Sequence, residues 1–326
     1  MSTAELPLRI VPAAAWERDL ALRLVLRRFP EAECRQQIEM LLAGEAAGAP
    51  AWEGLLAAYR GERQVGAVFS QIQPGKTAAV WSPQLVADEP ADTAGQLLDA
   101  VTRRLAERNV RVAQALLATD AQPEAETLRK GGFQHPADLL YLVCQAKDFP
   151  DDGKSETASA PESQSPQISQ LCSELRAEPY CEAAHARFAR VVEATYAGTL
   201  DCPSLNGVRD VEDVLTGYRA TGVFDPSRWL LIRWQPAGED VGCLILTDHP
   251  AHDTWELIYM GVLPQWRGHG WGIDIARWAQ RLCRRAGRQR LVLAVDAANA
   301  PALRMYAAAG FQAWDRRSVF LKIMGR

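Results

Sequence analysis

Residues Gln265-Trp-Arg-Gly-His-Gly-Trp-Gly272 form a glycine-rich stretch between a predicted strand and a predicted helix. The strand covers 254–262, and the helix covers 272–286 with its apolar residues on one side and most of its arginines on the other. Together, the strand end, glycine loop and helix start place several backbone N–H groups at the positive end of a helix dipole. We therefore expect this loop to bind a phosphate group, because glycine lets the backbone approach a ligand closely.

The elements around this loop predict a mixed α/β fold. Following the chain after residue 169, we expect a strand at 170–179, a helix at 181–195, a loop-rich stretch at 196–227, strands at 229–234, 241–247 and 254–262, helix 272–286, strand 291–296, helix 301–309 and strand 317–324. Before residue 149 we expect strand 8–11, helices 13–28 and 31–43, strands 54–59, 64–72 and 77–84, helix 93–107 and a strand near 139–144.

Residues 149–168 are rich in Pro, Ser, Asp and Glu and almost lack apolar side chains, which predicts a flexible linker. It separates a predicted domain 1–148 from a predicted domain 169–326. The two halves end alike, because Leu128-Arg-Lys-Gly-Gly-Phe133 and Tyr306-Ala-Ala-Ala-Gly-Phe311 each follow a similar helix. We interpret the chain as a diverged duplication.

Composition excludes several classes of protein. The chain has 326 residues, 48% of them hydrophobic, which is enough for two ordinary domains. It contains no run of about 20 apolar residues and no signal-peptide pattern near Met1, so we expect a cytoplasmic protein without a membrane segment. Its seven cysteines contain no Cys-x-x-Cys pair, so neither a disulfide framework nor a metal site is expected.

The charge is unevenly distributed along the chain. A net charge of −4 argues against a nucleic-acid-binding protein, and the basic helix 277–290 lacks interleaved aromatic residues and a known motif. From Tyr259 to the end, however, 12 Lys and Arg stand against 3 Asp. This segment would attract a polyanionic ligand.

The glycine loop also allows two competing interpretations. One is a Rossmann fingerprint, since the strand 291–296 ends in Asp296, as a ribose-binding acid would require. Only 30 residues follow Asp296, however, too few for the rest of a doubly wound sheet. The second interpretation is a purely structural tight turn.

A pair of motifs in the second half resembles the GCN5-related N-acetyltransferases (GNAT). The first is Val262-x-Pro-x-x-Arg-Gly-x-Gly-x-Gly272, and the second is Asn299-x-x-Ala-x-x-x-Tyr306-x-x-x-Gly-Phe311, at the separation usual for that family. The resemblance is close over 254–321. It implies two tandem GNAT-like domains, each a mixed, mostly antiparallel sheet flanked by helices. The plan is similar to that of the mycothiol synthases, as is the stretch Leu293–Asn299.

The resemblance also implies acetyl-CoA as co-substrate. Glycine-loop amides would hold its diphosphate, and the edge of the preceding strand would pair with its pantetheine arm. By position, the cofactor-binding residues are Met260, Gly261, Val262, Arg267, Gly268, His269, Gly270, Trp271, Gly272 and, close by, Asn299. Asn299 before Pro301 is also typical of a helix start, and His269 is equally well explained as a solvated side chain.

Acyl transfer to an amine needs a base and an acid. An alkylamine with a pKa of roughly 10 must lose a proton before it attacks. Glu256 is the candidate base, because it lies six residues before Val262 on one strand and so, with period-2 alternation, on the same face. By resemblance, Tyr306 is the candidate acid for the departing thiolate. A solvated strand carboxylate and a packed tyrosine are the alternatives.

The acceptor is expected to be a small primary amine. Tyr196, Thr199, Asp201 and Arg209 in the loop-rich stretch are candidate substrate-binding residues, although turns and caps explain them equally well. The first half lacks the glycine loop, has Asp88 and Glu89 in its place, and has Leu128 instead of Tyr306, so we expect a degenerate, non-catalytic domain. The alternative function for the whole chain is a CoA-binding sensor or scaffold without turnover.

Overall fold

A computed structural model describes residues 6–44, 52–151 and 169–325. By contacts, the chain divides into two compact units, which we call unit 1 (Met1–Pro136 with Arg317–Arg326) and unit 2 (Ala137–Arg316). Each unit therefore takes its last strand from the other half of the chain. Most of the predicted linker, residues 152–168, lies outside the described residues, and the division at 149–168 stays a prediction.

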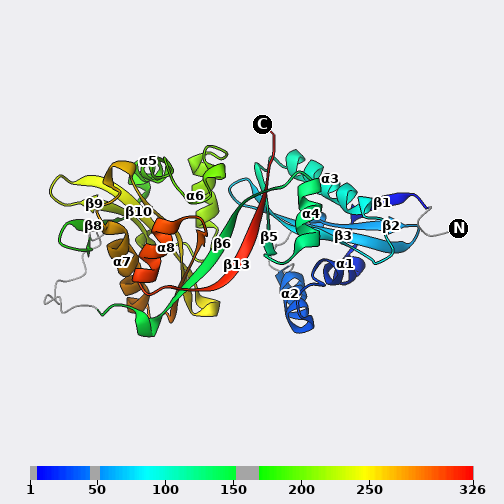
Figure 1. The fold of residues 1–326 in the computed structure, drawn as a ribbon, viewed down its shortest axis with the longest axis horizontal. Coiled ribbons are helices and arrows are strands. Elements are labelled where there is room, and N and C mark those ends of the chain that lie inside the picture. Colours follow the sequence, from blue (N-terminus) through cyan, green and yellow to red (C-terminus); the bar gives the residue numbers. More distant parts are fainter. Residues whose placement is uncertain (1–5, 45–51, 152–168, 326) are drawn as a thin grey trace. The chain divides into compact units, whose positions relative to one another are not determined.

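Unit 1 is a mixed sheet with strand order β1-β2-β3-β4-β5-β13, and its helices connect strands along the chain (Figure 1). Its main core joins sheet residues such as Leu56 and Val68 to Leu97, Leu98 and Leu128 of the helices. The strands are β1 (Leu8–Pro12), β2 (Leu55–Arg60), β3 (Arg63–Gln73), β4 (Thr77–Leu85), β5 (Val112–Ala118) and β13 (Gln312–Ile323), and the helices are α1 (Arg18–Val25), α2 (Glu31–Gly44), α3 (Asp92–Glu107) and α4 (Gln122–Lys130).

Unit 2 repeats this plan with strand order β6-β12-β11-β10-β9-β8-β7 (Figure 1). Helix α7 packs on the sheet through Ile275, Ala279 and Cys283, all fully buried. The strands are β6 (Gln134–Gln145), β7 (Ser169–Gln170), β8 (Leu175–Pro179), β9 (Trp229–Trp234), β10 (Glu239–His249), β11 (Thr254–Val262) and β12 (Arg290–Asp296), and the helices are α5 (His185–Thr195), α6 (Val211–Arg219), α7 (Trp271–Arg285) and α8 (Ala300–Ala308).

The predicted mixed α/β fold with two similar units is confirmed. In each unit a run of antiparallel strands leads to one parallel pair (β4–β5 and β11–β12), and a further antiparallel strand closes the edge. The stretch 196–227, expected to be loop-rich, also contains α6, which was not predicted. Strand β5 was not expected either, and α4 was expected as a helix near Leu128 but without bounds. Within the described residues, no helix is both long and apolar enough to cross a membrane.

Candidate functional site

A cavity of about 380 Å³ opens in unit 2 where β11 and β12 separate. The two strands pair only from Thr254–Glu256 to Arg290–Val292. Beyond that point β11 carries a β-bulge at Ile258, which bends the strand away from its neighbour. The backbone of 257–262 therefore lines the cavity on one side, with Ala294 and Val295 of β12 on the other.

Tyr306 of α8 reaches this cavity from a buried position. Its side chain is 6% exposed and packs edge-to-face on Phe311, with 5.4 Å between ring centroids. Its hydroxyl makes no hydrogen bond to any other described residue. Burial, and to a lesser degree the charge of Asp201, raises the pKa of this phenol. Tyr306 is therefore a protonated donor that faces the cavity without a protein partner.

Asp201 is the carboxylate that lines the same cavity, and backbone bonds hold it in place. One of its oxygens, Oδ1, accepts the N–H of Asp296 (2.8 Å), while its own N–H donates to Thr199 Oγ1 (3.1 Å). In return, Asp296 accepts the N–H groups of Cys202 (3.1 Å) and Ala298 (2.8 Å). Burial, opposed by the bond from the Asp296 amide and assisted by the Asp296 charge, raises the pKa of Asp201.

Arg267 connects two sides of the cavity. Its guanidinium donates to three backbone carbonyls, those of Val262 (3.0 Å), Gly198 (3.0 Å) and Thr195 (2.8 Å). Thr195 is the last residue of α5 and Gly198 lies just beyond it, where a cation is favoured by the helix dipole. Thr195 packs so closely on Gly261 that a Cβ there would come within 2.6 Å of it. The side chain of Arg267 therefore positions backbone groups around the cavity.

The glycine loop leads into α7 as the sequence predicts. Gly268 (φ 86°) and Gly270 (φ 79°) both adopt left-handed conformations, and no atom lies within 4 Å of a Cβ built on either. Gly270 is the N-cap of α7, and no side chain caps the first turn. The N–H groups that begin an α-helix have no partner within it. The start of α7 is thus an open arc of donors suited to an anion.

His269 packs beside that arc. Its ring stacks on Trp271 (4.8 Å between centroids), and its Nδ1 lies 3.1 Å from the carbonyl oxygen of Trp266. Trp234 packs on Trp266 in turn (5.2 Å). The imidazole is therefore part of an aromatic cluster next to the loop.

Glu256 is not among the residues that line the cavity. The expectation that it shares a face with Val262 was wrong, because the bulge shifts the register: Glu256 lies opposite Thr247 and Val262 opposite Gly242, an odd separation along β10. Its carboxylate instead meets His249 Nε2 at 2.8 Å, and it is partly exposed. Its role as a base stays a prediction.

The remaining candidate residues divide into two groups. Met260, Gly261, Val262, Thr199 and Asn299 line the cavity, and Asn299 Oδ1 also caps α8 by accepting the N–H of Ala302 (3.3 Å). Tyr196 lies in an aromatic cluster with Tyr218 and Tyr259, where burial raises its pKa to about 12. Neither Tyr196 nor Arg209 lines the cavity. Residues that line it without having been predicted are Thr195, Gly198, Leu200, Leu257, Ile258, Tyr259, Ala294, Val295, Pro301 and Ala302.

The chain is similar to known proteins in part of its sequence and in its fold. Residues 200–311, which include the glycine loop and most of the cavity lining, match the acetyltransferase (GNAT) family. The match lies entirely within unit 2 and covers less than half of the chain. No protein among the curated sequences is significantly similar to it. Because it contains this match, unit 2 is hereafter called the GNAT unit.

Solved GNAT structures share the fold of the chain. It is similar to a GCN5-related N-acetyltransferase from Sphaerobacter thermophilus, with a TM-score of 0.61 and 14% identity over 98% of each chain. It is also similar to a GCN5-related glucosamine N-acetyltransferase region of a fungal multi-domain GH3 beta-N-acetylglucosaminidase, with a TM-score of 0.62 and 13% identity, covering 98% of this chain and 38% of that one. At these identities the likeness concerns the fold.

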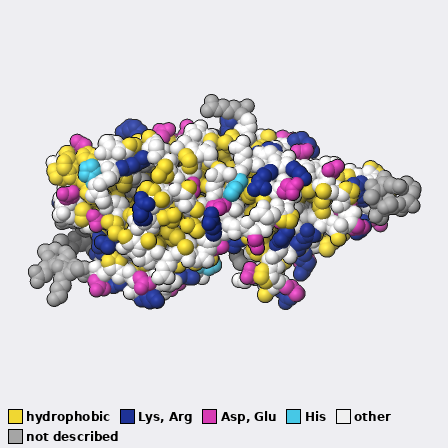
Figure 2. Space-filling model, in the orientation of Figure 1, with side chains coloured by type: hydrophobic (Ala, Val, Ile, Leu, Met, Phe, Trp, Pro, Cys, Tyr) yellow, Lys and Arg dark blue, Asp and Glu magenta, His cyan; other side chains and the backbone are white. Residues whose placement is uncertain are grey.

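Three of the four arginines of α7 in the GNAT unit contact other parts of the protein. Arg284 donates to the carbonyls of Ala146 (3.2 Å) and Phe149 (2.6 Å), and Arg281 and Arg285 both lie over the Trp278 ring. On the face shown in Figure 2, cationic side chains lie among apolar ones instead of forming one continuous patch. Among the described residues, no group of three or more His, Cys, Asp or Glu side chains could hold a metal ion.

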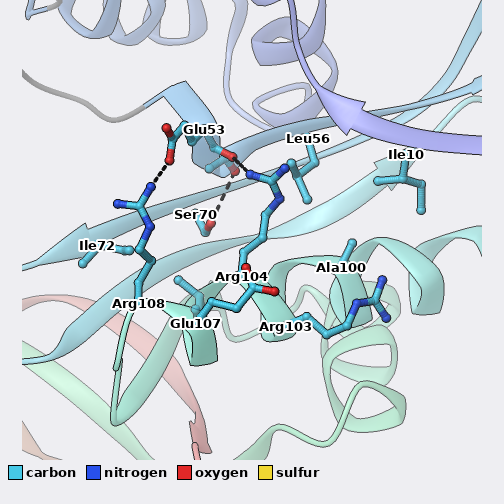
Figure 3. A pocket seen from close by; sticks show the side chains of 12 residues that line it. Ile10, Glu53, Leu56, Ser70, Ile72, Ala100, Arg103, Arg104, Glu107 and Arg108 are labelled. Carbon is cyan, nitrogen blue, oxygen red and sulfur yellow. Dashed lines mark hydrogen bonds and ion pairs between the residues drawn. The ribbon is translucent and has the colours of Figure 1, made fainter.

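Unit 1 has a basic cavity of about 350 Å³ beside α3. Figure 3 shows Glu53 between two of its arginines: Arg108 forms an ion pair with the Glu53 carboxylate, and Arg104 Nη1 donates to the Glu53 carbonyl oxygen (3.3 Å). Both arginines thus already have protein partners in this cavity.

Proposed function

We propose that the protein transfers an acyl group, acetyl by default, from acyl-CoA to the primary amine of a small acceptor. The observation that carries the proposal is the cavity between β11 and β12, which brings an unpartnered Tyr306 hydroxyl and the Asp201 carboxylate to one place. A concave site with titratable groups of shifted pKa is typical of a catalytic centre.

The coenzyme would lie across the glycine loop and along β11. The backbone amides from Gly268 to Gly272 would bind its diphosphate, since both positive-φ glycines leave the approach open. The β11 backbone at Met260–Val262 borders the cavity and would pair with the pantetheine arm. Arg267 supports this arrangement through the carbonyls it binds rather than by contact with phosphate.

In this proposal Asp201 is the carboxylate that takes the proton from the acceptor ammonium, directly or through water. Its Oδ1 is held by the Asp296 amide, while Oδ2 makes no hydrogen bond to another described residue. A raised pKa makes a carboxylate a stronger base. Asp201 replaces Glu256 in this role because Glu256 lies outside the cavity lining and is bonded to His249.

Tyr306 is the proposed acid. Once the neutral amine attacks the thioester carbonyl and the C–S bond breaks, the departing thiolate needs a proton. A phenol whose pKa is raised stays protonated throughout the ordinary pH range. The buried hydroxyl would donate that proton, and the phenolate would take up, directly or through water, the second proton that the attacking nitrogen must lose to become an amide.

Two measurements on the intact protein test the proposal. Calorimetry with acetyl-CoA tests whether the glycine loop binds the coenzyme. An assay of free CoA thiol over a panel of small primary amines tests turnover. We expect binding, together with release of CoA that depends on the amine. Failure to bind acetyl-CoA or CoA at millimolar concentration would refute the proposal. Binding without release for any amine would instead favour a sensor or scaffold.

A further inference from the structure

Unit 1 has its own cavity, of about 320 Å³, at the place that corresponds to the GNAT unit's cavity. Strands β4 and β5 pair only over Thr77–Ala79 and Val112–Gln114, and they then separate just as β11 and β12 do. Trp81, Ser82 and Gln84 of β4 and residues 116–118 of β5 line the space beyond. The duplicated fold thus keeps the opening where the glycine loop has been lost.

Two buried polar atoms in this lining lack partners. Glu124 of α4 is 5% exposed; its Oε1 accepts from Gln84 Nε2 (3.2 Å) and pairs with Arg28. Its Oε2 is buried and has no hydrogen-bond partner among the described residues, and the same holds for Oγ of Ser82, a residue that is also 5% exposed. Such atoms are rare in folded proteins, because a buried polar group without a partner is unfavourable. Both residues line the cavity.

The charged side chains of the lining differ in their exposure. Glu33 and Arg28 are exposed to water and Arg317 is half-buried, whereas the Glu124 carboxylate is buried. Water screens the charges at the rim more than the charge inside. Arg28 pairs with one oxygen of this carboxylate, so the other oxygen, Oε2, is the buried acceptor that remains for a ligand.

The rest of the lining determines what would satisfy the two unpartnered atoms. Val25, Phe29, Trp81 and Leu117 provide apolar walls. A carboxylate oxygen accepts hydrogen bonds only, and a hydroxyl can accept as well as donate. A cationic donor with an apolar body matches both the buried acceptors and these walls.

We propose that this cavity of unit 1 is a binding site for a small primary amine with an apolar body. The ammonium head donates to Glu124 Oε2 and Ser82 Oγ, and the body packs against Phe29 and Trp81. The site is independent of acyl transfer by the GNAT unit. Leu128 stands where that unit has Tyr306, so unit 1 binds the amine without reacting it.

Titration calorimetry with benzylamine on the full chain tests this site. Benzoate serves as the probe of the same shape and opposite charge. For a ligand of this size we expect a dissociation constant on the order of 1 mM for benzylamine and no measurable association of benzoate. Absence of benzylamine binding, or tighter binding of benzoate, would overturn the proposal.

Two variants test whether the heat of benzylamine binding comes from the cavity of unit 1. Ser82→Ala and Glu124→Gln should each weaken benzylamine binding about tenfold or more, the loss expected for a hydrogen bond or ion pair of a buried group. Ser82→Ala removes only an unpartnered hydroxyl, so the free variant should melt no lower than the wild type. Asp201→Asn, in the GNAT unit, should not change the part of the benzylamine binding heat that Ser82→Ala removes. Unchanged binding in both unit 1 variants would refute the site.

Discussion

Unit 1 and the GNAT unit share one order of elements but differ at the two places where acyl transfer would need chemistry. At the start of α7 the GNAT unit has an uncapped helix and two left-handed glycines. At the start of α3, unit 1 has Glu89, whose buried carboxylate accepts a hydrogen bond from Thr93 Oγ1 and pairs with Arg60. Unit 1 thus has a carboxylate at the position where, in the GNAT unit, a coenzyme phosphate is proposed to bind.

The second difference lies on the last helix of each unit. Tyr306 and Leu128 each stand four residues before a left-handed glycine, Gly310 (φ 87°) and Gly132 (φ 82°). Leu128 is fully buried in the unit 1 core. One turn earlier, the GNAT unit has an alanine, residue 302, where unit 1 has Glu124. The comparison teaches that strand separation supplies the cavity, whereas a few side chains decide which ligand it suits.

The largest effect should come from removing the GNAT unit's phenol. Tyr306→Phe keeps the ring and its contact with Phe311 but loses the proton donor, so kcat should fall about 10²–10⁴-fold. The acetyl-CoA dissociation constant should stay within about twofold, since no binding group is lost. Tyr218→Phe is the matched control, because Tyr218 does not line the cavity, and its activity should be close to wild type. Full turnover by Tyr306→Phe would remove Tyr306 from the mechanism.

Asp201→Asn should have the next largest effect, a loss of about 100-fold in kcat/KM. In the wild type the rate should rise with pH as Asp201 ionises above its raised pKa, and the variant should lack this acidic limb. Because the folded-state pKa lies above the unfolded one, the protonated form stabilises the fold at low pH, and this stability is lost as pH rises towards the folded pKa. The variant should therefore be at least as stable as wild type at neutral pH.

Glu193→Gln, the same chemical change on an exposed α5 residue, is the control for Asp201→Asn. A pH–rate profile and a thermal melt at neutral pH provide the two readouts. If Asp201→Asn kept its activity while Glu256→Gln lost it, the base would be Glu256, as the sequence alone suggested.

How much the sequence could predict depended on whether local pattern or tertiary geometry decided the feature. The glycine loop, α7 and β9 to β12 follow from periodicity and turn residues, and the structure places them close to the predicted bounds. Strand β5 was missed because Val112–Ala118 is rich in Ala and Leu, which favour helix, and only its neighbours β4 and β13 make it a strand. Helix α6 had one local signal, the N-cap Asp210, which accepts the Glu212 N–H.

The site itself was harder to predict. Glu256 was assigned by period-2 alternation, which a single bulged residue, Ile258, reverses. Asp201 and Asp296 lie 95 residues apart and meet only because the α5–α6 loop folds against the end of β12. Nothing in the local sequence predicts that reciprocal contact. The exchange of last strands between the halves is equally hard to predict, because β6 and β13 have similar patterns.

A third prediction tests the proposed phosphate-binding amides of the glycine loop by adding one methyl group among them. Gly270→Ala places a Cβ at φ 79° and in the open arc before α7, so the variant combines backbone strain with obstruction of the ligand. Acetyl-CoA affinity should fall about tenfold, measured by calorimetry on protein shown to be folded by circular dichroism. Undiminished affinity would mean that the diphosphate does not lie on these amides.

The smallest effect is expected from the same substitution in unit 1. Gly95 lies within the first turns of α3, its φ is not in the left-handed region, and no atom lies within 4 Å of a Cβ built there. Gly95→Ala should therefore stabilise the protein by about 0.5–1 kcal/mol, because alanine loses less backbone entropy in a helix. Urea denaturation would measure this gain, and acetyl-CoA affinity should not change. A fall in affinity would show that the start of α3 contributes to coenzyme binding. The proposed difference between the two units, in which only the start of α7 is free to bind a phosphate, would then be wrong.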